Sequence, residues 1–302
     1  MSNPHATSAF MSVLDKRLRE VFDGKFAEYD SGMISKYFRV ISGDSAFEEF
    51  NEIGELPDVT AFNGALSYLT RSPGYYTKLE PKEFAGGTMW ERKLLDDKKF
   101  PVFNDRTSDL AESMGRVRDK YAVKPFTGAF GAAFDFMTSE EGIALCGSHT
   151  TKSGVSTTTG FSNAGTSAMT KTSINATRIL MNKFKNGIGE RINMGNFVVV
   201  TPDFLSNTAY EATGYDPSNG AKSMLDPDSA NHKINTAAGI KVERLMRLDD
   251  NSTKNWFMVD WAKMKKHLVW LDRIKSEFDT TTDFDSKVVK ASVYARWCYG
   301  HT

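Results

Sequence analysis

The sequence contains only two cysteines, Cys146 and Cys298, among 302 residues. Two thiols cannot form the disulfide framework of a small secreted domain, so this scarcity is typical of a reducing compartment. No apolar run approaches the roughly 20 residues that a membrane helix needs. Residues 1–20 become charged before a signal-peptide core could form. We therefore expect no membrane among the partners of this protein.

The sequence also lacks a surplus of charge of either sign. Lysine plus arginine and aspartate plus glutamate number 38 each, so the formal net charge is zero. Proteins that grip nucleic acid normally carry a basic surplus, because their affinity comes from neutralising phosphates. Neutrality excludes that class for the molecule as a whole, and it gives little electrostatic protection against self-association.

Metal-ligating residues do not occur at the spacing that a metal site requires. Cys146 and His149 form a Cys-x-x-His pair, but a closed zinc site needs four ligands and no second pair exists. The acidic loop 279–285 resembles the start of a calcium loop, yet Phe284 replaces its glycine and Lys290 its closing glutamate. The sequence therefore predicts no metal and no cofactor.

Catalytic motifs are missing as well. Ser167 has no Gly-x-Ser-x-Gly context, and the five histidines are scattered along the chain. We predict no catalytic residue and a protein that is not an enzyme. The competing hypothesis is a hydrolase that uses Ser167 or His149, with activity lost on His149→Ala.

The most prominent segment that is present covers residues 104–136. Leu110, Met114, Val117 and Tyr121 recur at steps of three and four, which predicts one face of a long helix. Pro125 lacks the amide that would bond to Tyr121, so we expect a kink or break near residues 123–125. Asp105, Thr107, Ser108 and Asp109 are the candidate N-caps.

A second amphipathic helix is predicted for residues 8–29. Its apolar face carries Phe10, Leu14, Leu18 and Phe22 at steps of four. Two interpretations remain open at this point. The helix either docks on the core of its own chain or lies as an arm on a neighbouring subunit.

Residues 64–95 predict a long hairpin. Its halves are residues 64–80 and 88–95, and Ala85, Gly86 and Gly87 supply a turn. A projecting hairpin of this length is only marginally stable alone, so it needs a partner surface.

The rest of the chain predicts a mixture of helices and strands. Residues 137–196 are rich in glycine, serine and threonine, and a helix is expected at 174–185. Strands are predicted at residues 197–201, 240–248, 256–259, 267–273 and 287–299. The fold class is α+β.

Several stretches, in the same order, resemble the major capsid (major head) proteins of tailed phages, in particular the Mu-like group. They are Thr77–Phe100 (TKLEPKEFAGGTMWERKLLDDKKF), Glu141–His149 (EGIALCGSH), Phe161–Ile174 (FSNAGTSAMTKTSI), Asn255–Asp260 (NWFMVD) and Tyr294–Gly300 (YARWCYG). The resemblance covers about residues 20–302. Relatives commonly continue beyond this point, so a short or incomplete closing strand is expected.

This resemblance implies the Hong Kong 97-type phage capsid fold. Residues 1–40 would be the N-arm. Residues 41–136 plus 264–302 would be the peripheral domain, with the extended loop (E-loop) 64–95 and the spine helix 104–136, and residues 137–263 would be the axial domain. The expected inter-subunit contacts are Phe10, Leu14, Leu18, Phe22, Arg71, Tyr75, Tyr76, Lys78, Glu80, Lys82, Trp90 and Arg92.

The implied function is structural. Copies would self-assemble as hexamers and pentamers into an icosahedral head that encloses the genome in the virion, after assembly in the host cytoplasm. Partners would be neighbouring capsomers, the portal, separate scaffold or decoration proteins, and packaged double-stranded DNA bound without sequence specificity. The alternative is an encapsulin-like cellular shell protein of the same fold, which would carry a cargo peptide groove and no DNA.

Overall fold

We describe the fold from a computed structural model. The structure describes residues 7–29, 32–91, 93–94, 97, 100–150, 152, 162–215, 238–283, 285–286 and 288–302, with side chains from residue 14 onward. The chain forms two compact units. Unit 1 comprises Met1–Ala46, Glu80–Ala122 and Trp270–Tyr299, and unit 2 comprises Phe47–Leu79, Val123–Val269 and Gly300–Thr302.

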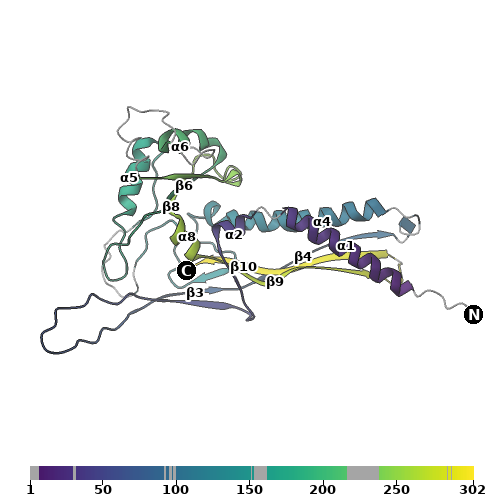
Figure 1. Ribbon diagram of the computed structural model, residues 1–302, viewed down its shortest axis with the longest axis horizontal. Coiled ribbons are helices and arrows are strands. Elements are labelled where there is room, and N and C mark those ends of the chain that lie inside the picture. Colours follow the sequence, from purple (N-terminus) through teal and green to yellow (C-terminus); the bar gives the residue numbers. More distant parts are fainter. Residues whose placement is uncertain are drawn as a thin grey trace, which may run out of the picture. The chain divides into compact units, whose positions relative to one another are not determined.

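Unit 1 is a four-stranded sheet with helices on one side (Figure 1). The strand order is β1 (Arg39–Ser42), β9 (Leu268–Thr282), β10 (Val288–His301) and β4 (Lys82–Glu91). Helices α1 (Thr7–Tyr29) and α4 (Phe100–Thr127) run along the sheet, and the short α2 (Met33–Tyr37) precedes β1. The predicted helix at 8–29 and the two predicted late strands are confirmed, and both strands are longer than expected.

Aromatic rings join α4 to the sheet. Trp297 on β10 stacks on Phe84 of β4 at 4.1 Å and on Trp270 of β9 at 4.7 Å between ring centroids, and Tyr121 of α4 meets it edge-on at 4.9 Å. Arg118, one turn earlier, donates to both carboxylate oxygens of Asp272 at 3.1 and 3.2 Å. A helix with poor intrinsic propensity is therefore held by its neighbours.

The predicted break at residues 123–125 is wrong, because α4 continues through Pro125 and ends at Thr127. Pro125 lies in the last turn, where its missing amide costs a single helical hydrogen bond. Ala122, Val123 and Phe126 are buried beside it, which compensates for that loss. The predicted bounds 104–136 are also wrong at both ends. The helix begins at Phe100, so the four candidate N-caps lie inside it, and it ends at Thr127, well before residue 136.

Unit 2 contains two three-stranded sheets. The first has the order β2 (Glu48–Ile53), β3 (Pro73–Leu79), β5 (Met137–Ser139). The second has the order β7 (Lys241–Arg244), β6 (Phe197–Thr201), β8 (Phe257–Asp260), with β6 parallel to β7 and antiparallel to β8. The helices of this unit are α5 (Lys171–Met181), α6 (Ser206–Thr213) and α8 (Trp261–His267), with 3-10 turns at Asp203–Leu205 and Met246–Leu248.

The core of the second sheet forms around β6, whose five residues are all buried, as the run FVVVT predicts. Ile174 and Met181 of α5 and Ala209 of α6 belong to the same cluster. Helix α5 begins with a capping box in which Thr170 and Ser173 satisfy each other's backbone amides. The predicted strand at 240–248 is shorter than expected, since residues 246–248 form a 3-10 turn.

The predicted pairing of the hairpin at 64–95 is wrong. Strand β4 pairs with β10 over Lys82–Glu91, and β3 pairs with β2 and β5 instead. Gly86 and Gly87 therefore lie within a strand and not in a turn. A Cβ on Gly87 would stand 3.1 Å from the carbonyl oxygen of Ala291, which explains glycine at this close strand pair.

Candidate functional site

The projecting hairpin of this molecule is formed by β2 and β3, residues 48–79. Glu48 pairs with Leu79 and Ile53 with Pro73, with a bulge between Asn51 and Ile53. The amide of Gly54 donates to the carbonyl oxygen of Ser72 at 3.0 Å, which closes the base of the loop 54–72. In Figure 1 this loop projects away from the two strands.

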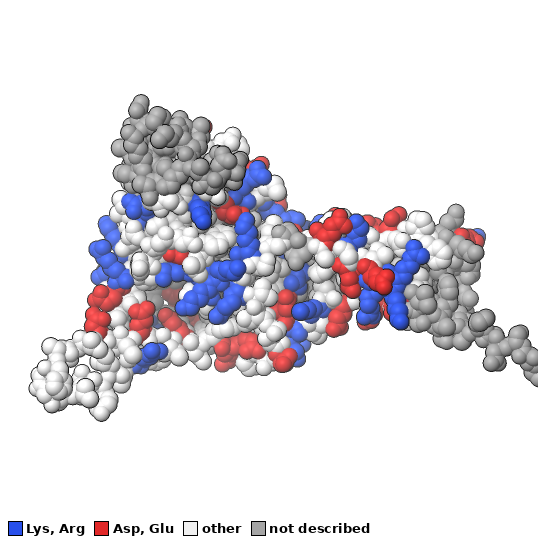
Figure 2. Space-filling view, in the orientation of Figure 1, with Lys and Arg blue, Asp and Glu red and all other residues white. Residues whose placement is uncertain are grey.

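The tip of the hairpin, residues 59–70, exposes its large apolar side chains to solvent. Val59, Phe62, Leu66 and Tyr68 are 87%, 74%, 76% and 90% exposed. Residues 59–70 contain no charged residue, and Figure 2 shows this lobe free of red and blue at the lower left. Scattered exposed apolar residues are ordinary, but a contiguous set of this kind marks an interaction site.

Four of the predicted contact residues lie on this hairpin. Arg71 and Tyr76 are exposed, whereas Tyr75 is half-buried with its hydroxyl 3.2 Å from that of Thr150. Lys78 places its ammonium group 4.2 Å from the centre of the Phe47 ring. These residues build the stem of the hairpin, so the apolar tip offers more free surface than they do.

Other predicted contacts need correction. Leu14, Leu18 and Phe22 are 5%, 0% and 0% exposed, and Phe22 stacks on Phe278 of β9 at 5.1 Å. These three residues pack within their own unit, which is one of the two interpretations that the sequence left open.

Trp90 is likewise unavailable, being 3% exposed against Phe103 at 5.2 Å. Lys82, the first residue of β4, and Glu80, just before that strand, are both exposed. The side chain of Phe10 and the whole of Arg92 fall outside the described residues. As contact residues, Glu80 and Lys82 stay predictions.

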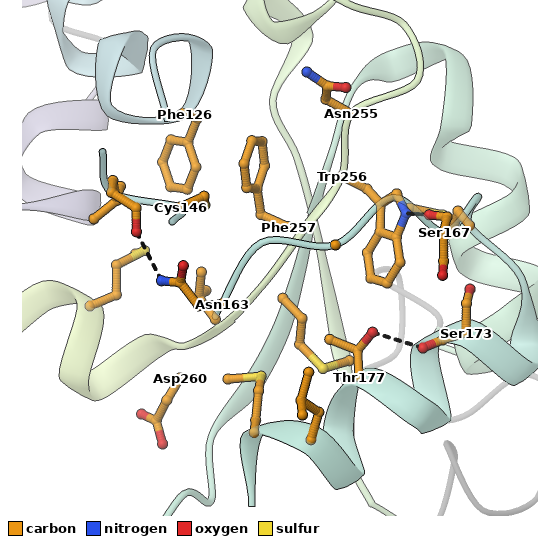
Figure 3. A pocket seen from close by; sticks show the side chains of 18 of the residues that line it. Phe126, Cys146, Asn163, Ser167, Ser173, Thr177, Asn255, Trp256, Phe257 and Asp260 are labelled. Carbon is orange, nitrogen blue, oxygen red and sulfur yellow. Dashed lines mark hydrogen bonds between the residues drawn. The ribbon is translucent and has the colours of Figure 1, made fainter. Parts of the chain in front are cut away.

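A groove of about 1180 Å³ is the second candidate feature, and all of its lining belongs to unit 2 (Figure 3). One wall is formed by three phenylalanines. The ring centroids of Phe126 and Phe130 lie 5.5 and 5.8 Å from that of Phe257. Another wall is the exposed side of α5, with Ile179 and Leu180 at 43% and 47% exposure. Its lining is predominantly apolar.

A few polar groups are fixed along the groove. Trp256 donates its indole N–H to the carbonyl oxygen of Ser167 at 3.0 Å, and the Asn163 amide donates to that of Leu145 at 2.8 Å. Asp260 accepts from the amides of Ala262 and Lys263 at the start of α8 and from Gly195. Although burial opposes ionisation, these backbone donors hold the pKa of Asp260 below its usual value.

The residues proposed for a hydrolase do not form a catalytic pair. The Nδ1 of His149 lies 3.0 and 3.2 Å from the Glu141 carboxylate, and its Nε2 contacts the Leu145 carbonyl oxygen at 3.3 Å. Ser167 instead serves as the backbone acceptor for Trp256. Burial raises the pKa of the Cys146 thiol to about 11, so it stays protonated and is a poor nucleophile.

Within the described part of the chain, no three histidine, cysteine or carboxylate side chains gather as a metal site requires. No helix there is long and apolar enough to cross a membrane. A third exposed apolar spot lies after β6 and β7, where Phe204 and Met246 are 72% and 62% exposed.

The tip of the hairpin is the feature that the sequence interpretation missed. Apolar residues at 59, 62, 66 and 68 follow neither a helical nor a strand period. The available signal was the uncharged run between Asp58 and Arg71 in a sequence in which 25% of residues are charged.

Comparison with known proteins points in one direction. The family model described as "Phage capsid protein" matches residues 75–300. No curated protein sequence matches the chain significantly.

Among solved structures, the chain is similar to the capsid of Ralstonia phage GP4, with 12% identity, a TM-score of 0.53, and coverage of 88% of this chain and 83% of that one. It is similar to the Cyanophage Pam1 capsid at 10% identity, TM-score 0.54 and coverage of 92% and 87%. It is also similar to the Cyanophage P-SCSP1u capsid at 8% identity, TM-score 0.53 and coverage of 89% and 84%. These likenesses confirm the predicted Hong Kong 97-type fold, whereas the narrower Mu-like assignment stays a prediction.

Proposed function

Because the chain belongs to the phage capsid protein family and is a major capsid protein of the phage head, we propose that its copies assemble as hexamers and pentamers into an icosahedral shell. The shell encloses packaged double-stranded DNA without reading its sequence. Zero net charge supports this role, because a strongly basic inner surface would hold the DNA too tightly for release.

The observation that carries this proposal is the exposed apolar tip of the hairpin. Four large apolar side chains are 74–90% exposed. In an isolated protein such a surface promotes aggregation, whereas in an assembly it stabilises the contact with the neighbour that covers it. We assign the E-loop to residues 48–79 and propose that its tip contacts a neighbouring copy. A contact of this kind, with different surfaces on the two partners, closes into rings when its rotation divides the full circle evenly.

We assign the peripheral and axial domains from the sheets and helices that each contains. Unit 1, with the long helix and the sheet β1-β9-β10-β4, corresponds to the peripheral domain. The layer of β7, β6 and β8 with α5 and α6 corresponds to the axial domain. The portal and separate scaffold or decoration proteins complete the partner set, assembly takes place in the host cytoplasm, and the protein is not an enzyme.

Sedimentation velocity and electron microscopy of the purified full-length chain test this function. We expect large closed particles, and their loss when residues 57–70 are replaced by a short Gly-Ser linker. A wild-type chain that sediments only as a monomer or a small oligomer contradicts the proposal. Particles that contain a protein cargo and exclude DNA during infection favour the encapsulin-like alternative.

A further inference from the structure

We propose that the groove of unit 2 is the receptor for the hairpin tip, residues 59–70, of a second copy of the chain. This inference rests on the proposed function, since it names the partner surface that the tip covers on assembly. Both halves of the contact are visible in one chain, because an apolar projection and an apolar depression are each exposed to solvent.

The size of the groove suits a peptide segment. Its volume of about 1180 Å³ lies above the roughly 300–1,000 Å³ of common small-molecule sites. Phe130, Ile179 and Leu180 are 43–49% exposed along it, so its walls keep apolar surface that no residue of the same chain covers. Large aromatic and aliphatic anchors that enter a pocket of this kind supply most of the binding energy in protein interfaces.

The charges around the two surfaces are complementary. The first strand of the hairpin and the residues leading to the tip carry five acidic residues and no basic one, namely Glu48, Glu49, Glu52, Glu55 and Asp58. The groove is rimmed by the lysines Lys183, Lys254 and Lys263. Arg71 and Lys78 on the second strand offset only part of this acidic charge, and Asp260 is the acidic residue among the groove lysines. An uncharged tip on a stem of net negative charge therefore matches an apolar groove whose lining is net positive, which favours one orientation of docking.

The strip 163–168 leaves room for an incoming segment. It is exposed, belongs to no helix or strand, and lines the groove at Asn163 and from Gly165 onward. A Cβ built on Gly165 meets no atom within 4 Å, and its backbone does not have a positive φ. A large side chain at position 165 is therefore compatible with the fold. It would occupy the part of the groove in which we place the tip.

Photo-crosslinking tests the proposal in assembled particles. Benzoylphenylalanine replaces Tyr68, with Leu66 as the alternative position if the first variant fails to assemble, and cross-linked peptides are identified by mass spectrometry. We expect links from the tip to peptides 163–184 and 254–264 of another copy. Particles whose tip links elsewhere, or to nothing, overturn the groove as receptor and leave the proposed function intact. Absence of particles from the wild-type chain overturns the proposed function itself.

A steric variant gives an independent readout. Gly165→Phe should fold normally, with unchanged thermal unfolding and circular dichroism, and should reduce particle yield at least tenfold. The matched control is Gly187→Phe, which also meets no atom within 4 Å and does not line the groove. Particles of Gly165→Phe that form as efficiently as those of Gly187→Phe contradict the proposal.

Discussion

Helix α1 and the hairpin tip are both apolar, yet they have opposite environments. Leu18 and Phe22 of α1 are fully buried within unit 1, whereas Phe62 and Tyr68 of the tip are 74% and 90% exposed. The helix has a polar face opposite its apolar face, so it can be covered on one side and solvated on the other. The tip has no charged face at all, so only a second molecule can remove its apolar surface from water.

The comparison shows that amphipathic periodicity indicates an apolar surface that is buried within the same chain. Apolar residues without period, in an uncharged run, identify surfaces left for a partner. In this capsid protein, helix α1 contributes Leu14, Leu18 and Phe22 to the core of its own unit. We propose the hairpin tip as the assembly contact.

The largest expected effect is on assembly. Replacing Val59, Phe62, Leu66 and Tyr68 together by serine should abolish particles, because the contact loses its apolar anchors. The free energy of unfolding of the subunit should change by less than about 0.5 kcal/mol for each substitution, as for other exposed positions. Electron microscopy and denaturant titration measure the two effects.

The control for that variant removes polar atoms from the same loop. Thr60, Asn63 and Ser67 changed to alanine keep the apolar set, so particles should persist. If the serine variant still forms particles of normal stability, the tip is not an assembly contact.

The next effect concerns the stability of the subunit. Phe22→Ala deletes a ring that stacks on Phe278 at 5.1 Å and on Phe26 at 5.7 Å, and should cost about 3–5 kcal/mol of unfolding free energy. Phe62→Ala, the matched change in the tip, should cost almost nothing in the dissociated subunit. Equal losses at both positions would break the comparison.

Acid should reveal a partly buried histidine at the end of β10. Burial, then the nearby His149, lower the pKa of His301 to about 4 from 6.5. The unfolded chain therefore protonates this imidazole more readily than the folded chain does. The contribution of neutral His301 to the free energy of unfolding is fully present above pH 6.5 and declines as pH falls toward 4. The loss reaches about 3 kcal/mol.

Denaturant titrations between pH 7 and 4 measure this decline, and His301→Gln should flatten the profile. A wild-type profile as flat as that of the variant over this range contradicts the assignment.

The smallest effect separates a strand from a turn at residues 86–87. Gly87→Ala should destabilise the subunit by about 1 kcal/mol, because the new Cβ stands 3.1 Å from the Ala291 carbonyl oxygen. Gly86→Ala, whose Cβ would make an ordinary 3.7 Å contact with Leu110, should be neutral. Equal losses in thermal unfolding would favour the turn that the sequence suggested.

Much of the fold was predictable from periodicity. The strand FVVVT, helix α1 and the two long terminal strands have strong patterns, and the structure has each of them. The strand pairing was not predictable, because Gly86-Gly87 carries the signature of a turn, while the 3.1 Å approach of Ala291 comes from a residue about 200 positions away in the sequence. The continuation of α4 through Pro125 was not predictable for a similar reason. Burial of Val123 and Phe126 outweighs the low helix propensity of proline.

The candidate site was less predictable than the fold. Most of the residues chosen on the hairpin belong to its stem, and the groove is assembled from segments between residues 126 and 302 that no local pattern joins. Charged and aromatic residues are natural candidates for inter-subunit contacts, yet Trp90 is buried in the core. Exposure depends on tertiary structure, which a single sequence does not display.

Hydrogen exchange of residues 59–70, in dissociated subunits and in assembled particles, tests the central claim most directly. The amides of the tip should exchange rapidly in the subunit and become protected in the particle, while those in the second half of α1 are protected in both states. A tip that exchanges equally fast in both states would contradict the claim that another copy covers it.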